Sequence, residues 1–394
     1  MTPLPKDAPR VLFPQELMAQ RPEGPLYGYF HPETRTANVL SCGAPPNRPK
    51  TFAPAQLLGW LGPRPEGSTC AQTGEGGEEQ AQDSPGPNLE GRWSEDGLQF
   101  KLDHRPCRIE FYSLTQDVFS RNTGILEVAR MLDKRVLVMA CGSVGSLLAL
   151  EFARAGVGNF LLVDPDTLEY HNLCRHQCSV TDVGRFKVDA LKDRILDINP
   201  AASVQTQKIV IQRLPKEVFD DFLRPGTLVL ASGDNREADL YANRISCLYK
   251  VPFLSIGLWE RAFAGEIFYS LPGETACYKC LYDNMGFNGG RVSENRRIYT
   301  TKEHLEDVRF EPGISTDLSL VSLIGAKVAY DLLDGTRRVL DHLTQYTLWC
   351  NSLDPEVGGE MVEIFTYPFQ VTRSIEVAKN DDCPHCKIVG AALE

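Results

Sequence analysis

The chain has 394 residues, of which 42% are hydrophobic and 24% charged, as in globular proteins large enough for two or three domains. Its formal net charge of −11 does not suggest a nucleic-acid partner, because a phosphate backbone attracts basic surfaces. The first residues do not form a signal peptide, and no run of about eighteen apolar residues predicts a membrane span. We therefore expect a cytoplasmic protein whose twelve cysteines are mostly reduced.

Residues 1–115 predict a small accessory domain of the α+β type. Alternating apolar residues predict short strands at 26–30, 36–41, 98–102 and 107–112. Residues 67–91 are rich in Gly, Glu, Gln, Ser and Pro, which predicts a flexible segment because little apolar surface is available for burial. No chemistry is recognisable here, so the domain either supports packing and dimer formation or recognises a protein substrate.

The most informative pattern begins at residue 135. An apolar run at 135–139 leads through Gly142 and Gly145 into a helical pattern at 147–155, and a second apolar run ends at Asp164. In a strand–turn–helix–strand unit, glycine admits phosphate to the backbone, the helix offers free N–H groups and the acid accepts from ribose hydroxyls. Because Ala140 stands where the first glycine is usual, we expect Gly142 and Gly145 to carry the turn. The alternative is an α/β turn without a ligand.

Strand and helix patterns then alternate through residues 116–394. They predict strands at 159–163, 204–211, 228–232 and 251–256, an amphipathic helix at 183–198, a buried helix at 316–333, and antiparallel strands at 263–270 and 360–377. This alternation predicts an α/β fold with a doubly wound, largely parallel, Rossmann-like sheet and an antiparallel C-terminal part. Ligands of such sheets bind at the carboxyl ends of the strands.

Polar residues that follow these strands favour a nucleotide whose phosphates react. They are Asp164, Asp166, Asn172, Arg175, Lys187 and Asp234. Cations, an amide and carboxylates of this kind neutralise phosphate and bind metal ions. A nicotinamide dehydrogenase would need only the ribose acid, and it would have no use for the arginine, the lysine and the last aspartate.

In this order the motifs resemble the ubiquitin-activating-type adenylyltransferases, which include the bacterial enzymes of molybdopterin and thiamine synthesis. The resemblance covers about residues 117–390 and includes residues 119–122, the glycine turn and two Cys-x-x-Cys pairs. It implies that Asp164 binds the ribose hydroxyls of ATP and that Asp234 holds Mg²⁺. It implies that the phosphates are contacted by Asn172, Arg175 and Lys187.

The same resemblance extends to Arg121 and Asp166. It implies that Arg121 reaches the ATP of the other subunit in a homodimer, and Asp166 matches an acidic position of the family. With its N-terminal domain, the whole chain resembles the activating enzymes of bacterial ubiquitin-like conjugation operons.

Two cysteine pairs predict a metal site. Cys277 and Cys280 form one Cys-x-x-Cys pair, and Cys383 and Cys386 form the other. Two such pairs usually make a tetrahedral zinc site, which is structural because four protein ligands leave no open position. A redox pair or unrelated thiols are the alternatives. His385, inside the second pair, is expected to be a bystander.

A cysteine expected from the family is missing. Members that form a thioester carry it between the first cysteine pair and the next apolar helix, but residues 281–315 contain none, and Arg309 stands at the matching position. The chain would then adenylate without a covalent intermediate of its own. Cys174, beside Arg175, is an alternative nucleophile, although Cys174 and Cys141 are more simply explained as walls of the nucleotide pocket.

These motifs predict an ATP-dependent adenylyltransferase. Its substrate would be the C-terminal carboxylate of a ubiquitin-like protein, which passes to a conjugating enzyme or a sulfur acceptor, and its cofactors would be Mg²⁺ and structural Zn²⁺. One alternative is a microcin-maturation-type enzyme that adenylates the C-terminus of a short peptide. The other is a non-catalytic scaffold subunit, which the intact polar motif argues against.

Overall fold

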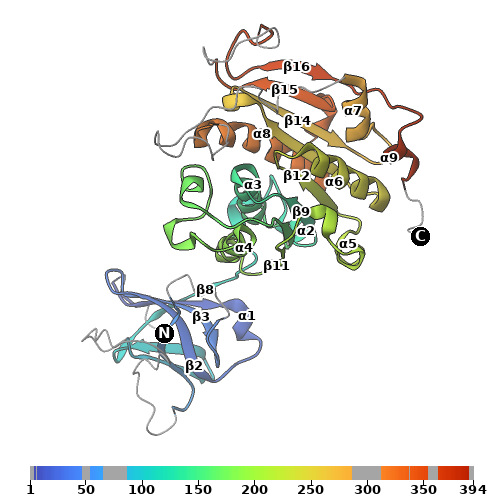
Figure 1. Ribbon diagram of the computed structural model, residues 1–394. Helices are drawn as coiled ribbons and strands as arrows, with labels where there is room; N and C mark the ends of the chain where they lie inside the picture. The colour runs from blue at the N-terminus through green and yellow to red at the C-terminus, as the bar shows by residue number, and fades with distance from the viewer. Residues whose placement is uncertain are drawn as a thin grey trace. The chain divides into compact units, whose positions relative to one another are not determined.

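A computed structural model describes residues 4–5, 7–46, 54–64, 87–285, 312–336, 338–353 and 363–389. The chain divides into two compact units, Met1–Ser120 and Arg121–Glu394. Figure 1 shows a strand-rich unit in blue and a larger unit of helices and strands in green to red.

The first unit is built on one mixed sheet of eight strands in the order β7-β6-β5-β4-β2-β3-β1-β8. The strands are β1 (Arg10–Pro14), β2 (Gly24–His31), β3 (Thr36–Cys42), β4 (Gln56–Leu61), β5 (Leu89–Ser94), β6 (Gly97–Leu102), β7 (Arg105–Pro106) and β8 (Arg108–Tyr112). A single short helix, α1 (Gln15–Met18), follows β1. Alternate strand residues, among them Val11, Phe13 and Leu26, form one buried cluster.

The prediction of a flexible segment at 67–91 is wrong at its C-terminal end. Residues 65–86 lie outside the described residues, but Leu89 to Gly91 belong to β5. Leu89 is fully buried, and it pairs with Gly59 on one side and Leu102 on the other. Pairing with a neighbouring strand on both edges therefore places these residues in a strand, although their local composition predicts a flexible segment.

The second unit has an eight-stranded sheet in the order β11-β10-β9-β12-β13-β14-β15-β16. The strands are β9 (Arg135–Met139), β10 (Asn159–Val163), β11 (Ser203–Gln207), β12 (Thr227–Ala231), β13 (Phe253–Leu258), β14 (Ala264–Ser270), β15 (Tyr346–Cys350) and β16 (Val371–Ile375). The first five in the order are parallel, and the last three pair antiparallel. The predicted α/β class and largely parallel sheet are confirmed.

Helices cover both faces of this sheet (Figure 1). They are α2 (Val128–Met131), α3 (Ser143–Arg154), α4 (Lys187–Ile198), α5 (Lys216–Phe222), α6 (Arg236–Tyr249), α7 (Tyr278–Met285), α8 (Ser315–Asp334) and α9 (Pro384–Lys387). Strand residues alternate between two buried clusters, so that Val136 and Val138 pack in the cluster of α3, α4 and α8, whereas Leu137 and Met139 pack in that of α5 and α6. The sheet is thus doubly wound.

The strand order places a topological switch at the centre of the sheet. From β9 the chain moves outward through β10 to β11, then returns to the other side of β9 to form β12 and β13. Connections on the two sides of β9 lead to opposite faces, and in open α/β sheets ligands bind at such a point, here the carboxyl ends of β9 and β12. The glycine turn follows β9, and residues 232–234 follow β12.

Several predicted bounds were wrong. The helix expected at 183–198 begins at Lys187, because Gly184 is left-handed (φ 89°) and Phe186 pairs with Thr167. The strand expected at 204–211 ends at Gln207. Of the strand expected at 360–377, residues 360–362 lie outside the described residues and only Val371–Ile375 is extended in the sheet. No strand was predicted at 346–350, where β15 lies between β14 and β16.

No helix among the described residues is both long enough and apolar enough to span a bilayer.

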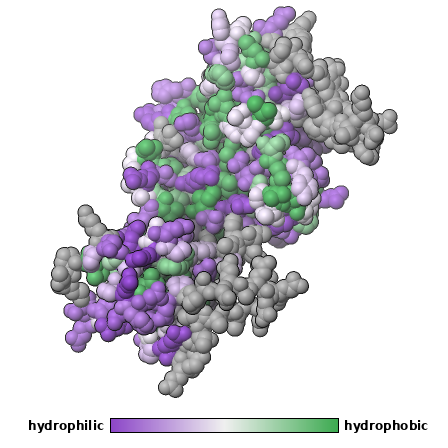
Figure 2. All heavy atoms as spheres, turned by 90° about the vertical axis from the view of Figure 1, so that its left-hand side faces the viewer, coloured by the Kyte–Doolittle hydropathy of each residue, from purple (hydrophilic) through white to green (hydrophobic). Residues whose placement is uncertain are grey.

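Helix α8 lies toward the left of Figure 1, the side that faces the viewer in Figure 2, where hydrophobic residues are exposed among hydrophilic ones. Several large apolar side chains on and next to this helix are exposed, namely Ile314, Leu320 and Leu323.

Candidate nucleotide-binding site and cysteine cluster

The turn after β9 is made differently from the sequence prediction. Ala140 itself adopts the left-handed conformation, with φ 69°. Gly142 has φ −75° and ψ −153° and forms the N-cap of α3, so it does not provide the left-handed residue of the turn. The expectation that both glycines carry the turn is therefore wrong for Gly142. The backbone of Ala140 is held at both of its polar groups, since its N–H donates to the carbonyl of Val163 (3.0 Å) and its carbonyl accepts from the Ser232 hydroxyl (2.9 Å).

Gly145 is required by close packing. A Cβ atom at this position would lie 2.0 Å from the carbonyl oxygen of Ala140 and 2.7 Å from Oγ of Ser232. The Ser232 hydroxyl is within hydrogen-bond distance of the carbonyl oxygens of Met139 (3.0 Å) and Ala140 (2.9 Å). The first turn of α3, the end of β9 and the end of β12 therefore meet here, and exposed Asp234 follows two residues later.

Asp164 is the buried acid of the site. It follows directly after β10 and is 4% exposed. Its Oδ2 accepts the backbone N–H of Cys141 (2.7 Å), and its Oδ1 accepts the backbone N–H of Asp166 (2.8 Å). Burial raises the pKa of Asp164, and the two backbone hydrogen bonds and the nearby Lys187 oppose that rise. The carboxylate thus links the carboxyl end of β10 to the glycine turn.

Lys187 is held beside the two predicted acids. It is the first residue of α4, and its ammonium group pairs with Oδ2 of Asp166 at 2.9 Å. The Lys187 side chain is 12% exposed and that of Asp166 is 62% exposed. The backbone N–H of Lys187 also donates to the carbonyl of Asp166 (2.9 Å). The Lys187 ammonium group is therefore nearly buried and is held next to Asp166.

Asn172 and Arg175 share one turn. Oδ1 of Asn172 accepts the backbone N–H of Glu169 (2.9 Å), and the Asn172 carbonyl accepts the N–H groups of Arg175 (3.0 Å) and His176 (2.8 Å). Nη1 of Arg175 would lie 3.6 Å from a Cβ atom at Gly313, just before α8. The arginine therefore reaches toward the segment that precedes α8.

His176 is a site residue for which the sequence motifs predict no role. It is buried, its Nε2 lies 2.8 Å from the carbonyl oxygen of Cys141, and its Nδ1 accepts the backbone N–H of Cys178 (3.1 Å). Burial lowers its pKa. The only signal in the sequence was its place next to Arg175.

Arg121 is the predicted site residue that lies apart from the others. It is exposed, and the side chain of the next residue, Asn122, donates to the carbonyl of Arg154 (2.8 Å), the last residue of α3. Gly142 lies at the other end of α3, which is about 18 Å long at about 1.5 Å per residue. Within one chain, Arg121 is thus far from the glycine turn.

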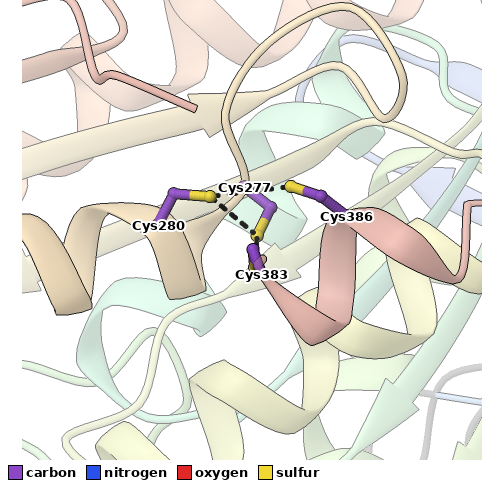
Figure 3. Close-up of side chains that lie close together, drawn as sticks. All are labelled: Cys277, Cys280, Cys383 and Cys386. Carbon is purple, nitrogen blue, oxygen red and sulfur yellow. Dashed lines mark hydrogen bonds between the residues drawn. The ribbon is translucent and has the colours of Figure 1, made fainter. Parts of the chain in front are cut away.

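The two cysteine pairs, 106 residues apart in sequence, converge on one point (Figure 3). The four sulfur atoms of Cys277, Cys280, Cys383 and Cys386 lie within 4.8 Å of one another. Three of the sulfur–sulfur distances are 3.9, 3.5 and 3.6 Å. Zinc–sulfur bonds of about 2.3 Å place tetrahedral ligands about 3.8 Å apart, so the residues fit a four-thiolate metal site. Among the described His, Cys, Asp and Glu, no other group could hold a metal in this way.

The remaining thiols differ in exposure. Cys174 is exposed, and its sulfur lies 3.4 Å from the His171 carbonyl oxygen. Cys141 is fully buried, and burial raises its pKa well above the usual range. Arg309 lies outside the described residues. His385 bonds Asn243 on α6 through Nδ1 (3.2 Å), and burial together with nearby cations lowers its pKa to about 4.

Comparison with known proteins places the chain in a family. The ThiF family model matches residues 116–383, and the chain therefore belongs to the ThiF family. The ubiquitin-like modifier-activating enzyme 5 of Caenorhabditis elegans is 31% identical over 163 residues, and the match covers 39% of each chain. The same enzyme of Drosophila mojavensis is 32% identical over 167 residues, 40% of this chain and 41% of the relative. The match thus spans about two fifths of these relatives.

Solved structures show the same fold. The crystal structure of E. coli MccB with ATP has a TM-score of 0.50 and 18% identity, and the match covers 69% of this chain and 75% of MccB. A second MccB structure, with MccA-N7isoASN, gives the same TM-score and identity and covers 76% of MccB.

Proposed function

We propose that this chain is an ATP-dependent adenylyltransferase that activates the C-terminal carboxylate of a ubiquitin-like protein. The observation that carries the proposal is the arrangement at the switch point, where buried Asp164 bonds the turn that opens α3 and Lys187, paired with Asp166, lies near Asp164. Membership in the ThiF family supports the proposal. So does the name of the relatives, ubiquitin-like modifier-activating enzyme 5 (below, the enzyme 5 relatives).

The nucleotide would be held by the turn and the acids. The first N–H groups of α3, at Gly142 and after it, are free to bind phosphate because a helix leaves its first N–H groups unpaired. Each Asp164 oxygen already accepts one backbone N–H and has a second lone pair for a ribose hydroxyl. Asp166 pairs with Lys187, so phosphate would compete with Asp166 for the lysine.

Adenylation needs countercharge rather than a base. The substrate carboxylate attacks the α-phosphate of ATP, a carboxylate oxygen–phosphorus bond forms, and the bond to the leaving pyrophosphate breaks. The carboxylate is already ionised at neutral pH. Negative charge grows on the phosphoryl oxygens, and the groups that would stabilise it are Arg175, Lys187 and the partner's Arg121. Asn172 would donate its amide N–H to phosphate, since its oxygen already accepts the Glu169 N–H.

Two metals belong to the proposal. Mg²⁺ would be held by Asp234, whose exposed carboxylate follows β12 at the carboxyl edge of the sheet, and would neutralise the leaving pyrophosphate. Zn²⁺ would be held by the four cysteines and would join α7 to α9. With four protein thiolates its part is structural.

The dimer and the acceptor are further parts of the proposal. The distance of Arg121 from its own glycine turn suits a role in the other subunit's site. Exposed Ile314, Leu320 and Leu323 offer apolar surface to a second copy. The family's thioester cysteine is missing between 281 and 315, so the acyl group would pass directly to a conjugating enzyme or a sulfur carrier.

A short peptide is the second candidate substrate. The likeness to the MccB structures covers 69% of this chain, whereas the ubiquitin-like modifier-activating enzyme 5 of Caenorhabditis elegans aligns with 39%. At 18% identity this likeness bears on the fold alone. The higher identity of the enzyme 5 relatives makes a ubiquitin-like protein our first choice.

The test is exchange of labelled pyrophosphate into ATP. We expect exchange that depends on a ubiquitin-like protein with a free C-terminus and disappears when that carboxylate is blocked as an amide. Exchange driven instead by short peptides that end in asparagine would favour the second candidate. A chain that binds ATP but exchanges with neither class would contradict adenylation and favour the scaffold alternative.

A further inference from the structure

His176 is a buried group at the candidate site that the proposed chemistry does not use. It is 7% exposed, and each ring nitrogen faces a backbone group. The N–H of Cys178 can only donate, so Nδ1 must accept and carries no proton. Nε2 then bears the proton and donates to the carbonyl oxygen of Cys141 at 2.8 Å.

This hydrogen bond completes the fixation of one peptide segment. The N–H of Cys141 donates to Asp164, and the carbonyl of Cys141 accepts from His176. Because a trans peptide is planar, holding the Cys141 oxygen aims the N–H of Gly142 to the opposite side. Gly142 is the N-cap of α3, so its N–H stands next to the unpaired N–H groups of the first helical turn.

The segment that carries His176 also contacts α3 directly. The N–H of Gln177 lies 3.4 Å from Oγ of Ser146, whose hydroxyl is 3.3 Å from the carbonyl oxygen of Ser143. His176 itself follows Arg175 in the turn that is closed by the carbonyl of Asn172. One short segment therefore ties the phosphate-binding arginine to the start of the helix.

We propose that His176 is a positioning residue that sets the direction of the Gly142 N–H toward the phosphates of ATP and couples it to Arg175. This inference rests on the proposed function, because it assumes that ATP binds at the turn. His176 touches neither the nucleotide nor the substrate in this role and acts through the backbone of Cys141.

The arrangement depends on the neutral imidazole. The groups that face it are the backbone carbonyl of Cys141 and the backbone N–H of Cys178, and the charged side chains that act on it are those of Lys187 and Asp182. Burial lowers the pKa of His176 below its ordinary value and Lys187 lowers it further, whereas the hydrogen bond to the Cys141 carbonyl and the charge of Asp182 oppose this. When the ring gains a proton in acid, Nδ1–H faces the N–H of Cys178, and that hydrogen bond is lost.

The experiment compares two variants by calorimetric titration with Mg-ATP at pH 7.5. Glutamine can accept through Oε1 and donate through Nε2, so His176→Gln is expected to bind ATP within about threefold of wild type. His176→Leu leaves the Cys141 carbonyl and the Cys178 N–H unpaired, and about tenfold weaker binding is expected. Circular dichroism checks that both variants fold.

The pH profile separates positioning from simple packing and does not need the leucine variant. Protonation of ATP itself affects both proteins, so the ratio of the wild-type to the His176→Gln dissociation constant isolates the imidazole. We expect this ratio to rise as the pH falls below the ordinary histidine range. A flat ratio, or equal binding by wild type and His176→Leu, would overturn the inference while leaving ATP binding intact. Wild-type protein that binds no ATP at pH 7.5 would overturn both the proposed function and the inference.

Discussion

The replacement of Gly145 by alanine tests the packing at the switch point. An added Cβ would lie 2.0 Å from the carbonyl oxygen of Ala140, whereas ordinary contacts begin at 3.4 Å. Helix α3 or the end of β9 must therefore move by about 1.4 Å, the difference between these two distances. The obstacle is backbone rather than the end of a flexible side chain, so the strain is not relieved by a rotamer change.

The magnitude follows from two opposing effects. Overpacking of a close-packed contact costs up to about 3 kcal/mol, and alanine gains about 1 kcal/mol over glycine inside a helix. The expected net loss is about 2 kcal/mol. At about 2–4 °C per kcal/mol, the thermal midpoint of Gly145→Ala should fall by about 4–8 °C.

Gly142→Ala is the matched control. Its φ of −75° suits alanine, and a Cβ there would meet no atom within 4 Å. The weaker N-cap and the smaller entropy of the unfolded chain nearly cancel, so a change within about 0.5 kcal/mol is expected. Thermal unfolding without nucleotide, followed by circular dichroism, measures both variants. Equal midpoints for Gly145→Ala and wild type, or an equal loss in both variants, would refute this reasoning.

Four further predictions concern the chemistry. Asp234→Ala should lower pyrophosphate exchange about a hundredfold or more without changing the thermal midpoint; near-normal exchange would contradict the magnesium assignment. Cys383→Ser should lower zinc content and stability together, since structural zinc is coupled to folding, and folded wild-type protein without zinc in elemental analysis would rule this out. Mixed dimers of Arg121→Ala and Lys187→Ala subunits should regain exchange at one intact site, whereas inactive mixed dimers would argue against sharing. Wild type with ATP and substrate should show no reducible adduct on a non-reducing gel; an adduct absent from Cys174→Ala would identify that thiol as a nucleophile.

Elements whose signals are local could be predicted from the sequence alone. The apolar runs 136–139 and 160–163 lie in central strands because a strand buried on both faces needs apolar side chains at successive positions. The spacing from the glycine turn to Asp164 was sufficient to predict that an acid lies beside the turn. The reason is that β9 and β10, which flank α3 in the sequence, are adjacent and parallel in the sheet.

Conformations that depend on residues distant in sequence could not be predicted in this way. Ala140 takes the left-handed conformation because Ser232, at the end of another strand, holds its carbonyl. Leu89 enters a strand through pairing on both edges, against its local composition. The contact of His176 with Cys141 joins residues 35 positions apart. Sequence patterns report periodicity over a few residues, whereas these conformations are fixed by hydrogen bonds and packing that exist only after the chain has folded.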